Sequence, residues 1–180
     1  MVPEIRLASV AEEAAVRAFY YDLIDACQND PYFPPWEKGI YPTDAMLASA
    51  IAAQTMYVGV KNGEICAAMI VSHDVPKGYT DGVWPLEADD DEFLVLHILA
   101  VAPTCRRQGV GEAMVRYALE LAKSAGMRSL RLDAWSQNAP AHALYRKLGF
   151  CEAGMMRETY DDGSFLDFWM FEYPLEEDFV

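Results

Sequence analysis

Apolar residues recur along the chain with two different spacings. Between positions 109 and 125 they fall at 110, 113, 114, 117, 118, 121 and 122, a spacing of three and four residues that predicts an amphipathic helix. Ser9 followed by Glu12 has the pattern of a capping box, which predicts that a helix begins there and runs to about Cys27. Two further helices are expected, one from a cap at Thr43 or Asp44 to about Gln54 and one from 138 to 148.

The other apolar stretches are short and are bounded by turn residues, which is typical of β-strands. Lys-Asn-Gly at 61–63 predicts a hairpin, and Asp-Asp-Gly at 161–163 joins the last two strands. Positions 29–43 contain four prolines and four aromatic residues and are expected to be irregular. The element order β-α-α-β-β-β-α-β-α-β-β predicts a mixed α/β fold with helices on the faces of a mixed sheet. The expected strands lie at 4–8, 56–60, 64–72, 93–101, 129–134, 150–159 and 164–173.

Length and composition narrow the class of protein. A chain of 180 residues with 53% hydrophobic content is expected to form one domain over 1–180. A formal net charge of -14 argues against nucleic acid and anionic membranes as partners, and no apolar run approaches the roughly 20 residues that span a bilayer. The N-terminus lacks a signal-peptide pattern and the four cysteines form no CxxC pair, so we expect a cytoplasmic protein with reduced thiols. Three histidines without metal-binding spacing predict no metal site.

The segment 96–115, LHILAVAPTCRRQGVGEAMV, places two arginines and two glycines between an apolar strand and the start of a helix. The first amides of a helix have no internal acceptors and carry partial positive charge, so such a turn favours an anion. Gly109 and Gly111 have no Cβ and let an anion approach the backbone, while Arg106 and Arg107 add formal charge. A pyrophosphate fits these features, whereas the Walker and dinucleotide-binding patterns do not match the segment.

Two motifs stand out in this part of the chain. The first is Arg106-x-x-Gly109-x-Gly111, preceded by Leu-Ala-Val-x-Pro, and the second is Asn138-x-x-Ala141-x-x-Leu144-Tyr145-x-Lys147-Leu148-Gly149-Phe150. Both resemble motifs of the GNAT N-acetyltransferase superfamily. They stand in the family's order and spacing. The resemblance covers the element order of nearly the whole chain and is strongest from about Leu94 to Phe150. It implies a mostly antiparallel, twisted sheet of about seven strands with about four flanking helices, and acetyl-CoA as cosubstrate.

The resemblance also assigns residues to acetyl-CoA. The family holds the CoA pyrophosphate on backbone amides of this turn and pairs the strand before it with the pantetheine arm. Asn138 would hydrogen-bond the cofactor arm, although the N-cap of the following helix is an equally good interpretation of its position. The residues implied in cofactor binding are Leu99, Val101, Arg106, Arg107, Gln108, Gly109, Val110, Gly111, Glu112 and Asn138.

Two side chains are the candidate catalytic groups. Tyr145 matches the tyrosine that protonates the departing CoA thiolate in many family members, which suits a phenol with a pKa of about 10; the alternative is an aromatic core residue. His97 matches a histidine that acts in deprotonation in some members, and the alternatives are a water-holding or a core histidine. Strand alternation predicts that Val95 and Leu99 flank His97 on one face. His142 is expected on a solvent-facing or cofactor-facing rim of its helix.

The expected acceptor is a primary amine of a small molecule. Positions 87–92 hold five carboxylates in six residues, which form either a solvated loop or an attraction for an ammonium group. The aromatic residues of 29–43 either cover the core or, as in the family, roof the acceptor pocket. The alternatives for function are transfer to protein lysines or N-termini, and an inactive acyl-CoA-binding sensor. The resemblance also makes the closing strands a site of dimer contact, which leaves a homodimer open.

Overall fold

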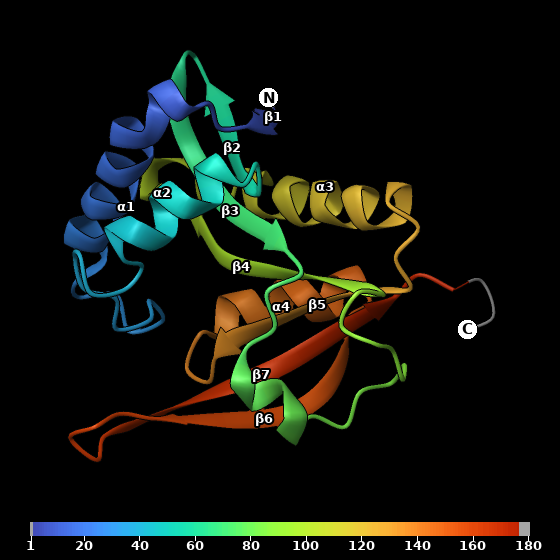
Figure 1. Cartoon of the computed structure of the whole chain (residues 1–180). Coiled ribbons are helices and arrows are strands. Elements are labelled where there is room, and N and C mark those ends of the chain that lie inside the picture. The colour runs from blue at the N-terminus through green and yellow to red at the C-terminus, as the bar shows by residue number, and fades with distance from the viewer. Residues whose placement is uncertain (1, 177–180) are drawn as a thin grey trace. The chain divides into compact units, whose positions relative to one another are not determined.

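The computed structural model describes residues 2–176, and Figure 1 shows its helices and strands. Over these residues the strands follow the order β1-β2-β3-β4-β5-β7-β6 and are accompanied by four α-helices, which confirms the mixed, mostly antiparallel seven-stranded fold. The strands are β1 Glu4–Leu7, β2 Met56–Lys61, β3 Glu64–Ser72, β4 Phe93–Val101, β5 Ser129–Trp135, β6 Cys151–Thr159 and β7 Phe165–Pro174. The helices are α1 Glu13–Cys27, α2 Asp44–Ala52, α3 Val110–Ser124 and α4 Ala139–Leu148.

Contacts divide the chain into two compact units, each made of two separate stretches. The first contains residues 2–71 and 97–118, and the second contains 72–96 and 119–176. Both β4 and α3 therefore contribute residues to each unit. The single domain expected over 1–180 stays a prediction.

The first unit is built on the antiparallel strands β1, β2 and β3, with α1 and α2 packed beside them (Figure 1). The predicted capping box is confirmed, because the Ser9 backbone N–H donates to Glu12 Oε2 at 2.9 Å. The predicted cap of the second helix is confirmed too, since Thr43 Oγ1 accepts from the Met46 backbone N–H at 3.0 Å. The core of this unit joins apolar faces of α1 and α2 to the strands, with Val16, Tyr20, Leu47, Met56 and Val58 fully buried.

The second unit is built around β5. This strand runs parallel to β4 from Phe93↔Ser129 to Leu96↔Leu132, and it runs antiparallel to β7 along its whole length. Strands β6 and β7 form a long hairpin (Figure 1). Residues 73–92, expected as a loop, contain the 3-10 helix Lys77–Asp81. One buried cluster in the core of this unit contains Tyr79, Phe93, Val95, Ala153, Met156 and Met170.

Strand β4 does not alternate regularly. In its first part the odd-numbered residues Phe93 and Val95 are buried, whereas from Leu96 onward the even-numbered residues Leu96, Ile98 and Ala100 are buried. The pattern therefore changes phase between Val95 and Leu96. Ile98 has a φ of 45°, in the left-handed region that a β-branched residue rarely adopts. The simple alternation that predicted Val95 and Leu99 on one face with His97 therefore does not hold, because it assumed an extended backbone throughout the strand.

Candidate functional site

The glycine turn, residues 102–112, connects the end of β4 to the first residues of α3. Arg107 has a φ of 58° and Gly109 a φ of 78°, so two residues of the turn lie in the left-handed region. A Cβ added at Gly109 would meet no atom within 4 Å, which means that backbone conformation and not crowding requires this glycine. A turn that passes through the left-handed region can direct neighbouring N–H groups to one side, as anion-binding turns do. The turn therefore fits a pyrophosphate, as its sequence predicts.

The side chains of the turn brace it against neighbouring segments. Arg106 Nη1 lies 2.6 Å from Asp30 Oδ2 in an ion pair, and Arg106 Nη2 lies 3.0 Å from Cys27 Sγ. Gln108 Nε2 donates to the Thr104 backbone carbonyl at 2.8 Å, and its Oε1 accepts from Lys61 Nζ at 2.8 Å. The formal charge expected from Arg106 is thus offset by a carboxylate. Lys61, which the motif does not contain, brings a third cation to the turn, beside Arg106 and Arg107.

The other residues implied in cofactor binding occupy two settings. Val110 begins α3 with its side chain buried in the core, so the group it offers is its backbone amide. Glu112 Oε1 accepts from Arg116 Nη2 at 2.9 Å, one turn further along α3. Leu99 and Val101 are partly buried residues of β4. Gly111 follows Val110 in the first turn of the same helix.

Asn138 caps α4, which confirms one of its two interpretations. Its Oδ1 accepts from the Ala141 backbone N–H at 3.2 Å. This bond uses the side-chain carbonyl and leaves the amide NH₂ as the group that a cofactor could meet. Asn138 and Tyr145 belong to the second unit, whereas the glycine turn and His97 belong to the first.

Tyr145 has the burial expected of a core aromatic residue. Its side chain is 5% exposed, and its ring lies 5.7 Å from Phe150 and 5.5 Å from Phe171, measured between centroids. Burial raises the pKa of Tyr145 above its usual value, and the negative charge of Asp133 raises it further. The phenol is therefore protonated at neutral pH and can act only as a proton donor.

Asp133 is the titratable group that sequence reasoning missed. It lies on β5 directly after Leu132, the last residue of this strand that pairs with β4. Its Oδ1 accepts a hydrogen bond from the Tyr79 hydroxyl at 3.0 Å. The pKa of Asp133 is raised to about 6, chiefly by burial and also by the charge of Glu158, while the hydrogen bond from Tyr79 opposes this rise. A carboxylate with this pKa is ionised at neutral pH and can accept a proton. We call Tyr79, Asp133 and Tyr145 the Asp133 cluster.

The sequence offered one signal for Asp133. In Ser-Leu-Arg-Leu-Asp-Ala-Trp, a carboxylate and a guanidinium both occur inside one predicted strand, where charged groups are rarely buried without a reason. Tyr79 gave no comparable signal, because 54 positions separate it from Asp133. The contact exists only once the chain is folded.

The histidines differ in their surroundings. His97 is partly buried on β4, directly before the left-handed Ile98. His142 is 5% exposed, its Nε2 lies 3.0 Å from the Trp135 carbonyl, and its ring lies 5.7 Å from that of Phe171. A solvent-facing rim was therefore wrong for His142, because the ring packs into the unit's interior, where burial lowers its pKa.

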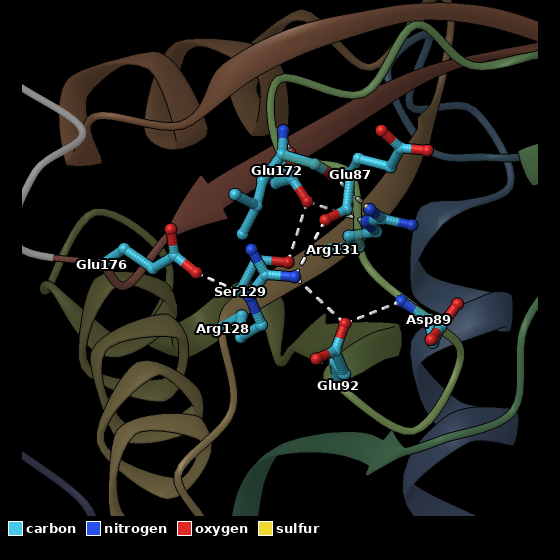
Figure 2. A network of polar contacts seen from close by, with 9 residues as sticks. Glu87, Asp89, Glu92, Arg128, Ser129, Arg131, Glu172 and Glu176 are labelled. Carbon is cyan, nitrogen blue, oxygen red and sulfur yellow. Dashed lines mark hydrogen bonds and ion pairs between the residues drawn. The ribbon is translucent and has the colours of Figure 1, made fainter.

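The acidic segment 87–92 is tied to the start of β5, as Figure 2 shows. Arg128 donates to the Glu87 carbonyl at 2.9 Å and forms ion pairs with Glu92 at 3.0 Å and Glu176 at 2.5 Å. Beside it, the buried side chains of Arg131 and Glu172 pair at 2.8 Å. One carboxylate of the segment thus holds the loop in place, while the side chains of Glu87 and positions 89–91 are exposed.

A cavity of about 250 Å³ lies in the first unit at the C-terminal end of α1. Phe33 and Trp36 meet edge to face at 5.3 Å between ring centroids and also pack against the core. These two rings therefore cover the core, as one of the two interpretations expected, and they also line a hollow, while a roof over the acceptor pocket stays a prediction. The lining residues are Ile24, Cys27, Gln28, Asp30, Phe33, Pro34, Pro35 and Trp36.

No helix between residues 2 and 176 has the length and apolar content needed to cross a membrane. In the same part of the chain, no group of three or more His, Cys, Asp or Glu side chains is placed to hold a metal ion.

Curated proteins resemble part of the chain. The [ribosomal protein bS18]-alanine N-acetyltransferase of Escherichia coli K12 is 39% identical over 70 residues, which cover 39% of this chain and 47% of that protein. Streptothricin acetyltransferase of Streptomyces lavendulae is 34% identical over 70 residues, which cover 39% of this chain and 37% of that protein. The chain thus spans half or less of the length of these two relatives.

Solved structures resemble nearly the whole chain. A GNAT family acetyltransferase from Streptococcus agalactiae has a TM-score of 0.75 at 18% identity, covering 97% of this chain and 96% of that one. A Salmonella typhimurium structure solved with its cofactor acetyl-CoA has a TM-score of 0.68 at 22% identity, covering 98% and 96%. At these identities the likeness shows the fold. The sequence model of the Acetyltransferase (GNAT) family matches residues 19–150 of the chain. The chain therefore belongs to the GNAT acetyltransferase family, whose acetyl donor is acetyl-CoA.

Proposed function

We propose that this protein transfers the acetyl group of acetyl-CoA to a primary amine of a small molecule by direct attack. The observation that carries the proposal is the Asp133 cluster, which offers one group able to accept a proton near neutral pH and one able only to donate. A binding protein for acyl-CoA needs an anion site but has no use for such a pair. The cluster therefore favours an enzyme over an inactive sensor.

Acetyl-CoA supplies an activated acetyl thioester when it is bound. The glycine turn would hold the pyrophosphate on its backbone amides, since Arg107 and Gly109 give it a concave N–H surface. Partly buried Leu99 and Val101 on β4 are the proposed partners of the pantetheine arm, and the Asn138 amide would add a hydrogen bond. These residues bind and orient the donor.

The protons move through other side chains. We assign Asp133 the proton of the attacking ammonium group, because its carboxylate is ionised above a pKa of about 6. We assign Tyr145 the protonation of the leaving thiolate, because its phenol remains protonated. His97 stays the alternative acceptor, directly or through a water molecule.

The acceptor amine could belong to a small molecule or to a protein. The relatives include an enzyme named for a ribosomal protein and one named for streptothricin, so similarity does not choose between the classes. The cavity beside Phe33 and Trp36 favours a small molecule, because aromatic walls around a hollow suit a compact amine. The proposed homodimer through β6 and β7 stays a prediction.

An acetylation assay over a panel of amines tests the function. The panel contains small aryl and alkyl amines, a lysine peptide and a peptide with an N-terminal alanine, and the readout is the release of free CoA thiol. We expect amine-dependent release with at least one small amine. Release only with the peptides would support the protein-modifying alternative, and thermal protection by acetyl-CoA without release from any amine would support the sensor.

A further inference from the structure

Tyr79 lies on a segment for which the sequence predicts no role. It belongs to the 3-10 helix Lys77–Asp81, between β3 and β4, and its side chain is 3% exposed. Its hydroxyl donates to Asp133 Oδ1 at 3.0 Å. Within residues 2–176, Tyr79 is the residue that hydrogen-bonds the Asp133 side chain. The segment between the two strands therefore reaches the proposed proton acceptor through a single phenol.

The position of Tyr79 is fixed by a chain of buried contacts. Trp84 Nε1 donates to the Tyr79 carbonyl at 2.8 Å, and the two rings lie 4.9 Å apart. The Arg131 guanidinium lies over the Trp84 ring at 4.2 Å from its centroid. Glu172 in turn fixes Arg131 at 2.8 Å, and both are labelled in Figure 2. Because each of these groups has its partner, the phenol has little freedom to leave Asp133.

The backbone beside Tyr79 is also closely packed. A Cβ added at Gly78 would lie 2.7 Å from Met156 Sδ and 2.9 Å from Met156 Cβ. Such distances leave no room for a side chain, so the 3-10 helix rests directly on β6. The hydroxyl is thus aimed at β5 by packing on one side and by Trp84 on the other.

The groups around Asp133 act on its charge in opposite directions. Glu158 from β6 raises the pKa of Asp133, as burial does, whereas the hydrogen bond from Tyr79 lowers it. Tyr145 from α4 interacts with Asp133 but is itself neutral near pH 7. Arg131, two positions earlier on β5, is paired with Glu172. Tyr79 is therefore the neighbour that favours the ionised carboxylate, because its donor hydrogen stabilises negative charge.

We propose that Tyr79 is a positioning residue for the transfer reaction: its hydroxyl fixes the Asp133 carboxylate by donating a hydrogen bond to Oδ1 and stabilises the negative charge there. The residue acts through Asp133 and does not itself exchange a proton with the acceptor. This inference rests on the proposed function, in which Asp133 accepts the proton of the amine. It gives the segment between β3 and β4 a part in catalysis.

The substitution Tyr79→Phe tests the inference, because it removes the hydroxyl and keeps the ring. The pKa of Asp133 is measured in the free protein from the pH dependence of its side-chain ¹³C carboxyl shift. We expect it to rise above the wild-type value of about 6, and the acid limb of the pH–rate profile to move up with it. Turnover should fall most below pH 7 and return close to wild type by about pH 9.

A matched control removes the same kind of bond elsewhere. The Tyr21 hydroxyl donates to Asp44 Oδ1 at 2.8 Å in the first unit, so Tyr21→Phe deletes a phenol–carboxylate bond outside the cluster. This variant should leave both the Asp133 titration and the rate profile unchanged. In wild-type protein, the Tyr79 ¹³Cζ shift should change with the midpoint of Asp133, which tests the contact without any variant.

The outcomes separate the inference from the function on which it rests. The inference is overturned if the pKa of Asp133 is unchanged in Tyr79→Phe. It is also overturned if the Tyr79 ¹³Cζ shift of the wild type does not change as Asp133 titrates. A rate that falls equally at every pH also overturns it, since that pattern marks a structural defect. A pKa that rises while the rate profile stays in place supports the control of Asp133 by Tyr79 and contradicts Asp133 as the proton acceptor.

Discussion

The glycine turn and the Asp133 cluster are assembled in different ways, although both are proposed to serve one reaction. The turn consists of consecutive residues, among them the left-handed Arg107 and Gly109, and its proposed chemistry lies in backbone N–H groups. The cluster consists of three side chains from a 3-10 helix, a strand and an α-helix. A backbone site can be written in a short motif, whereas a side-chain site depends on the fold that brings its parts together.

Their electrostatics differ as well. The charges at the turn are solvated and paired, as in Arg106–Asp30, where the Arg106 side chain is 38% exposed. Exposed pairs of this kind contribute little to stability and chiefly orient the segment. In the cluster, burial shifts the pKa of both Asp133 and Tyr145 upward. The turn is thus proposed to bind a ligand through its backbone, whereas the cluster is proposed to transfer protons.

The largest expected effect belongs to Gly109→Asp, which breaks the binding half of this comparison. Asp at a φ of 78° strains the turn, and its carboxylate repels the pyrophosphate. In the wild type, acetyl-CoA at 100 Kd should stabilise the fold by about 2.7 kcal/mol. The variant should lose this thermal protection and all turnover, as followed by melting temperature and CoA release.

Gly163→Asp is the matched control for that change. Gly163 has a φ of 83° in the turn between β6 and β7, and a Cβ there would also meet no atom within 4 Å. It should carry the same strain and charge while keeping the protection by acetyl-CoA. If Gly109→Asp were protected as well as Gly163→Asp, the anion site would have to lie elsewhere.

The same contrast explains how much the sequence could predict. The element order, the capping box at Ser9 and the turn at Gly109 depend on neighbours within a few residues, and the structure contains them as predicted. The left-handed Ile98 and the bond from Tyr79 to Asp133 do not, because tertiary packing decides both. Tyr145 was proposed from its motif, whereas its neighbour Asp133 could be proposed only from the fold.

The second effect in size concerns the proton acceptor. Asp133→Asn keeps an oxygen that accepts from Tyr79 but cannot take up a proton, so turnover should fall by about 10²–10⁴-fold. His97→Ala should retain the acid limb of the pH–rate profile if Asp133 is the acceptor. Profiles of both variants from pH 5 to 9 decide between them. A near-normal rate in Asp133→Asn, together with a lost acid limb in His97→Ala, would move the role to the histidine.

The third effect separates binding from chemistry within the cluster. Tyr145→Phe removes one hydroxyl from a residue whose ring packs on Phe150 and Phe171, so the fold and the protection by acetyl-CoA should persist. Turnover should fall by about 10²-fold, the low end of what a positioned acid contributes. The loss of turnover should be smaller with acyl donor analogues whose leaving thiol is less basic, because such a thiolate departs without needing a proton. An unchanged rate would leave Tyr145 as a core residue only.

The smallest expected effect is on the melting temperature, which should rise when Asp133 loses its charge and fall when Asp162 does. The pKa of Asp133 is raised in the folded protein, so its contribution to stability is present at low pH and is lost as pH rises through about 6. Asp133→Asn should therefore raise the melting temperature by a few degrees at pH 8 and by less at pH 5.

Asp162 should show the opposite behaviour. Hydrogen bonds from Ser164 lower the pKa of Asp162 in the exposed β6–β7 turn, so its contribution to stability is present above its ordinary pKa and is lost as pH falls. Asp162→Asn should lower the melting temperature slightly at pH 8. If the melting temperatures of both variants changed in the same direction at pH 8, burial of the ionised Asp133 carboxylate would not be what destabilises the fold.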